Sequence, residues 1–194
     1  MSEARREAPA AARNREPILG VLLPRLTQGA RLLEVASGSG EHALWIAQAR
    51  PDLHVQPSDP QPEARASIAA WCQGVANIAP ALALDAAGNW PAVSADAVLC
   101  INMIHIAPWE ATLGLMRGAA SALAPGGALF LYGPYRVGGA MVESNQEFDA
   151  RLRAENAAWG VRALEDVTAA AQGFAPPIIT PMPANNLFLE FRRR

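Results

Sequence analysis

Lysine is absent from this chain of 194 residues, and cysteine, tyrosine and histidine are scarce. The absence of lysine excludes a P-loop, because that phosphate-binding loop requires a lysine followed by serine or threonine. Cys72 and Cys100 are isolated from each other, so neither a disulfide framework nor a CxxC redox motif is expected. The three histidines, His42, His54 and His105, are scattered without metal-ligand spacing. We therefore expect no bound metal.

An excess of either charge and a long apolar run are also lacking. The net charge is −2, which provides no basic field for nucleic acid or anionic lipid. The longest apolar run, "ADAVLCINMIHIAPW", contains Asp96, Asn102 and His105 and is too short to span a membrane. The first 17 residues have no apolar core of the kind that a signal peptide needs. These absences predict a soluble, cytoplasmic protein, with the oligomeric state left open.

Apolar patterns typical of strands alternate with helical patterns along most of the chain. Residues 1–12 are rich in Ala, Glu and Arg and are interpreted as a flexible arm, followed by a single domain over 13–194. The expected strands are 31–37, 53–59, 78–85, 95–102 and 126–135. The expected helices are 15–26, 41–51, 61–75, 108–123, 145–159 and 163–174. This alternation indicates an α/β fold, in which helices cover both faces of a parallel sheet.

The end of the chain departs from this alternation. Two strand patterns over 177–194 are separated by only a few residues around Pro183 to Asn186. So short a connection can form only an antiparallel hairpin, because a parallel crossover needs about a dozen residues or more. The sequence thus predicts seven strands, with the last one antiparallel, inserted beside 126–135 and buried on both faces.

A glycine loop follows the first expected strand in the stretch "RLLEVASGSGEHA". From Gly38 to Ala43 it matches the dinucleotide-binding pattern GxGxxA. Asp59 lies 59 − 40 = 19 residues after Gly40, where a ribose-binding acid is expected. Taken alone, this match leaves an NAD(P)-dependent oxidoreductase open.

Three features favour S-adenosylmethionine (SAM) over a dinucleotide. Glu34, inside the first strand, is awkward beside a pyrophosphate but suits the cationic methionyl amine. Asp85 ends another expected strand and is placed to accept the adenine amino group, although "DAAGNW" is also ordinary turn chemistry. The closing antiparallel hairpin is typical of a methyltransferase sheet. The loop is therefore predicted to hold a nucleoside without phosphate.

Ordered motifs along the chain resemble those of the class I SAM-dependent methyltransferases: "LLEVASGSGEH", "QPSD", "LALD", "CINMIHIAPWE" and "LAPGGALFLYGPY". More narrowly, the chain resembles the DUF938 family, also catalogued as UPF0585, in "RNREPIL", "INMIHIAPW", "GPY", "SNQEFD", "LRAENAAWGVRALEDV" and "MPANNLFLEFR". The resemblance covers nearly the whole chain from Arg13 and implies a Rossmann-like sheet and SAM as cofactor. Ala36 departs from the usual first glycine, and Ala12 and Ala163 stand where the family is expected to have acids.

Residues at successive strand ends are the candidates for cofactor binding, with Asp59 predicted to accept both ribose hydroxyls. The predicted cofactor-binding residues are Glu34, Ala36, Gly38, Gly40, His42, Asp59, Asp85, Asn102 and Met103. A helix cap at Asp59 and a purely structural His42 are the alternatives to these roles.

The methyl acceptor is expected beyond the carboxyl ends of the strands, where open parallel sheets bind their ligands. His105 is the candidate general base, with Tyr132 and Tyr135 as orienting groups. The predicted acceptor-binding residues, from the N-terminal segment, the 145–159 helix and the hairpin turn, are Arg13, Asn14, Asn145, Phe148 and Asn185. Ordinary turn chemistry is the alternative for Asn185.

A SAM-dependent methyltransferase with a small-molecule acceptor accounts best for these features. The [DN]PP[YF] element of enzymes that methylate amino groups of nucleic acids is absent, since "INMI" follows the 95–102 strand. A SAM-binding interaction module without catalysis is the main alternative. An NAD(P)-dependent oxidoreductase is the second.

Overall fold

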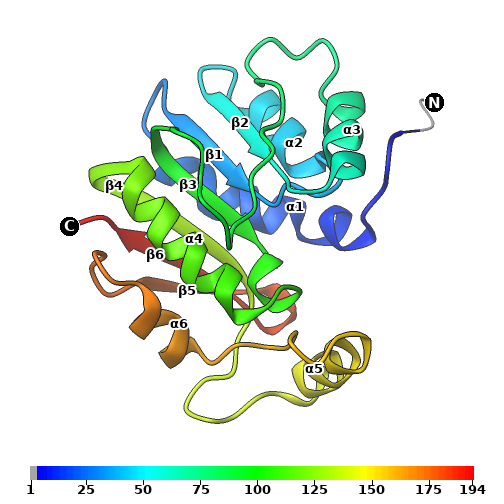
Figure 1. Cartoon of the computed structure of the whole chain (residues 1–194), viewed down its shortest axis with the longest axis vertical. Helices are drawn as coiled ribbons and strands as arrows, with labels where there is room; N and C mark the ends of the chain where they lie inside the picture. The colour runs from blue at the N-terminus through cyan, green and yellow to red at the C-terminus, as the bar shows by residue number, and fades with distance from the viewer. Residues whose placement is uncertain (1–3) are drawn as a thin grey trace.

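A computed structural model describes residues 4–194 as a central sheet between two layers of helices (Figure 1). The strands are β1 (Arg31–Val35), β2 (His54–Ser58), β3 (Ala95–Ile101), β4 (Leu123–Pro134), β5 (Ile178–Met182) and β6 (Asn186–Arg192). The α-helices are α1 (Pro9–Leu22), α2 (Glu41–Ala49), α3 (Pro62–Trp71), α4 (Trp109–Ala122), α5 (Glu143–Glu155) and α6 (Leu164–Ala170). Three short 3-10 helices are η1 (Leu23–Arg25), η2 (Met103–His105) and η3 (Pro183–Asn185).

The sheet has the order β2-β1-β3-β4-β6-β5, in which β1 to β4 are parallel. The predicted α/β fold with a closing antiparallel hairpin is confirmed: β6 lies antiparallel between β4 and β5. Phe188, Leu189 and Phe191 of β6 are fully buried on alternating faces, which explains the apolar run without polar alternation. Glu190 is also buried, and it accepts hydrogen bonds from Arg25 at 3.0 Å and Arg192 at 2.7 Å.

The strand count is six rather than seven, because the segment 78–85 does not form a continuous ladder. It runs parallel to β2 but pairs with it only through isolated bridges, Val55 with Ile78 and Ser58 with Leu82. Pro57 in β2 and Pro80 in the neighbouring segment have no N–H to donate between these two bridges. The chain therefore occupies the position of an edge strand without the regular hydrogen bonds of one.

The first helix begins earlier than the sequence pattern suggests, at Pro9 instead of near Arg15, and Pro17 lies inside it. The segment before it, within the expected arm, is packed against α2 and α3. The backbone N–H groups of Arg6 and Ala8 donate to the side chains of Ser67 and Glu41 at 2.9 and 2.8 Å. The N-terminal segment thereby covers the region where α2 starts.

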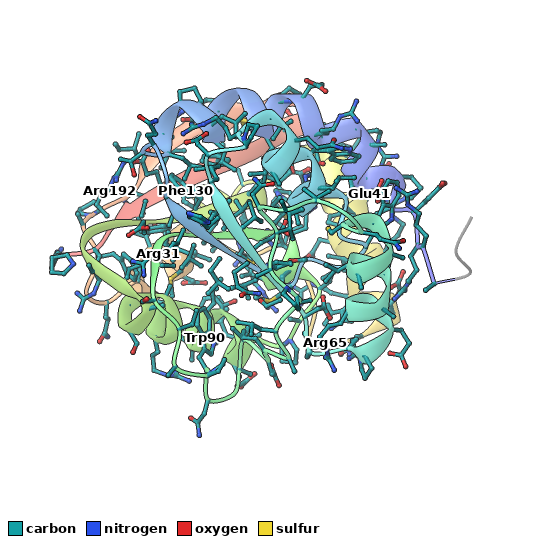
Figure 2. All side chains as sticks on the ribbon, turned by 90° about the horizontal axis from the view of Figure 1, so that it is seen from above. Arg31, Glu41, Arg65, Trp90, Phe130 and Arg192 are labelled. Carbon is teal, nitrogen blue, oxygen red and sulfur yellow. The ribbon has the colours of Figure 1, made fainter. Side chains whose placement is uncertain are left out.

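Two apolar clusters fill the space between the sheet and the helix layers. One joins α1 and α2 to the sheet and includes Phe130 and Phe188, and the other joins α4 and α6 to the opposite face. Viewed from above, Glu41 at the start of α2 lies at one end of the sheet, and Arg31 and Arg192 lie at the other (Figure 2). The end near Glu41 is the carboxyl end of the parallel strands, and the candidate site lies there. Within residues 4–194, no helix combines the length and apolar character needed to cross a membrane.

Candidate functional site

The glycine loop between β1 and α2 has left-handed backbone at two of its glycines. Gly38 has φ 57° and Gly40 has φ 94°, conformations that favour glycine. A Cβ at Gly40 would lie 2.7 Å from the Cα of Ile68, so this glycine is also required for close packing against α3. A Cβ at Gly38 would meet nothing within 4 Å. The loop is thus tightly packed on its α3 side and open above Gly38.

Ala36, which replaces the usual first glycine, also has positive φ, at 58°. For a residue with a Cβ, this conformation costs about 1–2 kcal/mol relative to the right-handed form. The departure therefore introduces backbone strain into the loop, which the sequence comparison alone did not suggest.

Asp59 lies at the end of β2, facing the glycine loop. Its carboxylate is buried and accepts hydrogen bonds from the backbone N–H groups of Gly38 at 3.1 Å and Gln61 at 3.0 Å. Each oxygen has a lone pair beyond these bonds, so the carboxylate can also accept from a ligand hydroxyl. Asp59 thus binds backbone N–H groups as a helix cap would, and it also lies where a ribose-binding acid is expected.

Glu34 is buried in β1, and its Oε2 atom has no hydrogen-bond partner within residues 4–194. Burial raises the pKa of this carboxyl to about 7, and the nearby charge of Asp59 acts in the same direction. A hydrogen bond from Ser37 opposes the shift. An unpaired buried acid is costly, and a cationic ligand group would both pair with it and favour its ionised form.

His42 and Asp85 are less well placed for the roles expected of them. His42 is buried at the start of α2, edge-on to Trp45, and burial lowers its pKa to about 4, so the ring is neutral. Asp85 is exposed, and its Oδ1 accepts from the N–H of Ala87 at 2.9 Å within its own turn. The alternative of ordinary turn chemistry therefore describes this side chain, and an adenine contact stays a prediction.

A cavity of about 700 Å³ adjoins this region at the carboxyl ends of β3 and β4. Helix α5 and the turn between β5 and β6 lie beside the same edge of the sheet (Figure 1). Six of the residues singled out from the sequence line this cavity: Arg13, Asn14, Asn102, Tyr132, Asn145 and Phe148. Asn185 lies directly behind it, since its carbonyl accepts from the Asn145 side chain at 3.2 Å. Elements from opposite ends of the chain thus enclose one pocket.

The sequence analysis missed several apolar residues of this cavity. They are Ala10, Pro17, Ile106, Pro134, Pro183 and Ala184. Ile106 is 45% exposed, and its position in the motif that follows β3 was a usable signal. Pro17 stands near the start of the expected helix over 15–26, but it lies inside α1 of the structure. As an interior proline it has no N–H for the carbonyl of Arg13, which is left without its helical partner.

His105 and Tyr135 are on the far side of β4 from the cavity. Tyr132 belongs to the apolar cluster on the α1 face, whereas Tyr135 belongs to the cluster on the α4 face, together with Met103. His105 is fully buried, edge-on to Tyr135 with 5.3 Å between ring centroids. Neither the Nε2 atom of His105 nor the hydroxyl of Tyr135 has a hydrogen-bond partner among the described residues.

This placement does not suit the general base expected at His105. Burial, together with the positive charge of Arg162, lowers the pKa of the imidazole to about 3. The ring does not line the cavity, and so weak a base is a poor proton acceptor near neutral pH. Tyr132 is the only member of the predicted catalytic trio that reaches the cavity, and burial raises the pKa of its hydroxyl.

Replacing Gly133 by alanine is expected to destabilise the protein by about 1–3 kcal/mol through overpacking. The added Cβ would lie 2.5 Å from Nε2 of His105 and 3.3 Å from Oδ1 of Asn102. Urea denaturation measures the change, with Gly20→Ala as the control. A Cβ at Gly20, in helix α1, meets nothing within 4 Å, and this change is expected to be neutral or stabilising. An unchanged midpoint for Gly133→Ala would show that His105 is not held against β4.

No group of three or more His, Cys, Asp or Glu side chains within residues 4–194 is arranged to hold a metal ion. The polar groups that converge at this edge are the two buried acids near the glycine loop and the amides and single guanidinium of the cavity. The two acids suit an organic ligand with cationic and hydroxyl groups. The cavity suits a second, more apolar molecule beside it.

Comparison with known proteins gives one family match and many structural ones. The family described as "Protein of unknown function (DUF938)" matches residues 5–193. An O-methyltransferase family protein from Burkholderia thailandensis has a TM-score of 0.79 at 18% identity, over 95% of this chain and 57% of that chain. The SAH-bound protein PigF has a TM-score of 0.79 at 17% identity, over 95% and 56%.

Human N-acetylserotonin methyltransferase in complex with SAM is also similar, with a TM-score of 0.78 at 13% identity, over 95% of this chain and 52% of that chain. The chain thus spans little more than half the length of each of these proteins. At such identities the likeness shows a shared fold.

Proposed function

The chain belongs to the DUF938 family, and from this membership and the geometry of the site we propose that it is a SAM-dependent methyltransferase with a small-molecule acceptor. The observation that carries the proposal is the placement of two buried acids, Glu34 and Asp59, beside an open glycine loop, with a separate cavity at the same edge of the sheet. The solved structures of similar fold include SAM- and SAH-bound methyltransferases, which supports the choice of cofactor.

The residues around the loop fit SAM better than a dinucleotide. Glu34 needs a donor for its orphaned Oε2, and the methionyl amine provides one with a positive charge. The same carboxylate would be unfavourable behind a pyrophosphate, which is itself anionic. Asp59 is proposed to accept the ribose hydroxyls, and Gly38 leaves space for close approach of the ligand.

SAM, when bound, supplies a methyl group that is already activated as part of a sulfonium. The protein has to exclude water and hold the acceptor in line with that group. The cavity walls beside Asn102 and Tyr132 are proposed to do this, because both residues lie at the strand ends next to the loop. His105 is proposed to support the wall from behind β4, where it contacts the backbone at Gly133.

Calorimetry with SAM, SAH and NADH on one sample tests the cofactor. We expect SAM and SAH to bind and NADH to give no measurable heat, because the loop pairs a buried acid with the ligand instead of a phosphate site. Tight binding of NADH without SAM would replace the proposal with an oxidoreductase. A screen of metabolites with methyl-labelled SAM then separates an enzyme from a binding module, since a module binds SAM and methylates none of them.

A further inference from the structure

The acceptor cavity contains an unpaired positive charge. Arg13 is the one charged residue among the described residues that line it, and no carboxylate within residues 4–194 pairs with its guanidinium. Arg15, which follows two residues later on the same helix, already has partners. It pairs with Glu16 at 2.9 Å and lies over the ring of Trp45. Helix α1 therefore presents one neutralised arginine and one that is free to bind an anion.

The remaining walls are apolar or neutral. The cavity has apolar surfaces formed by Pro17, Ile106, Pro134 and Phe148. Ile106 is 45% exposed, which is a large fraction for an aliphatic side chain. The volume of about 700 Å³ is in the range of pockets that enclose one drug-sized ligand. These walls favour an acceptor whose body is apolar or aromatic.

Three of the four asparagines that line the cavity fall into two kinds by their hydrogen bonding. Asn145 and Asn186 donate to backbone carbonyls around the β5–β6 turn, so they brace the wall. The Asn14 side chain lies against the hydroxyl of Tyr132, and its buried Oδ1 has no hydrogen-bond partner among the described residues. A buried acceptor of this kind is costly unless a donor reaches it, which indicates a hydroxyl or amino group on the ligand.

We propose that the cavity recognises a small aromatic or apolar carboxylate that also carries a hydrogen-bond donor, with Arg13 binding the carboxylate and Asn14 accepting from the donor. A single guanidinium matches a carboxylate in charge and in its two-pronged geometry, whereas a phosphate dianion would leave charge uncompensated here. The proposal rests on the proposed function, since it takes this cavity as the acceptor site.

The test compares 4-hydroxycinnamate with its primary amide, 4-hydroxycinnamamide, by calorimetry on the SAH-saturated protein. The two probes have nearly the same shape and differ in charge. We expect the carboxylate to bind roughly 10- to 100-fold more tightly, the range for a charge-assisted pair in a partly enclosed site. Arg13→Gln should remove this preference, whereas Arg15→Gln, on the same helix, should keep it.

Equal affinity for the two probes in the wild type, or an unchanged preference in Arg13→Gln, would overturn the proposal. So would the absence of binding by 4-hydroxycinnamate, benzoate and 2-naphthoate at millimolar concentration. Titration of SAH into the same proteins separates the two levels. A carboxylate preference that depends on Arg13 in a protein that does not bind SAH would refute the methyltransferase assignment and leave the carboxylate site standing.

Discussion

Replacing Asp59 by alanine is expected to lower the affinity for SAM by roughly 30- to 1,000-fold, on the order of 2–4 kcal/mol. In the proposed complex the buried carboxylate accepts from the ribose hydroxyls, and it also holds the N–H of Gly38, which shapes the glycine loop. Both contributions disappear together in the variant. Calorimetric titration with SAM and with SAH measures the loss.

Asp59→Asn separates the two contributions, because the amide keeps the shape and one acceptor oxygen but loses the charge. We expect it to be intermediate between wild type and Asp59→Ala. Asp96→Asn is the matched control: this acid pairs with Arg31 at the opposite end of the sheet. An unchanged dissociation constant for SAM in Asp59→Ala, with the fold intact, would refute the ribose role.

The stability of the unliganded protein is expected to fall by about 3 kcal/mol between pH 4.5 and pH 7 through Glu34 alone. The pKa of this group is raised from 4.5 to about 7 by burial. Below pH 4.5 the carboxyl is protonated in both the folded and the unfolded chain, so it contributes nothing. As the pH rises, the unfolded chain loses the proton first while the folded protein retains it, and folding becomes less favourable. The loss is complete above pH 7.

The measurement is urea denaturation of the wild type and Glu34→Gln over this pH range. The difference between the two proteins is the informative quantity, because the buried histidines His42 and His105 act in the opposite sense. Their pKa values are lowered to about 4 and about 3, so they increase stability as the pH rises towards 6.5. A difference that does not change with pH would show that Glu34 titrates normally.

Saturating SAH adds a second readout for Glu34. The cationic amine of SAH is proposed to pair with the ionised carboxylate of Glu34, and this pairing relieves the cost of burying the charge. The stabilisation by SAH should therefore grow between pH 5 and pH 7 in the wild type and change less in Glu34→Gln. Equal growth in both proteins would indicate that the amine binds elsewhere.

Several features of the fold were predictable from local sequence because local physics determines them. The alternation of strand and helix patterns identified the parallel sheet, and the short connection at Pro183 excluded every arrangement except a hairpin. The glycine loop and Asp59 were found from spacing, since left-handed turns and strand-end acids leave a signature in residue type. The strand at 78–85 was overestimated, because Pro57 and Pro80 have no N–H to donate between the bridges at Val55–Ile78 and Ser58–Leu82, and only the pairing reveals that the two segments are neighbours.

The tertiary structure decided which of the predicted site residues line the cavity and which lie on the other face of the sheet. Tyr132 and Tyr135 are close in sequence but belong to opposite faces of the sheet, and His105 is sealed behind β4, although its motif marks the correct strand end. The cavity depends on contacts between α1, α5 and the β5–β6 turn, whose residues are far apart along the chain. Sequence alone thus determined which residues gather at the carboxyl edge of the sheet. Only packing decided which of them face the cavity, because the side to which each side chain points and its exposure depend on neighbours from distant segments.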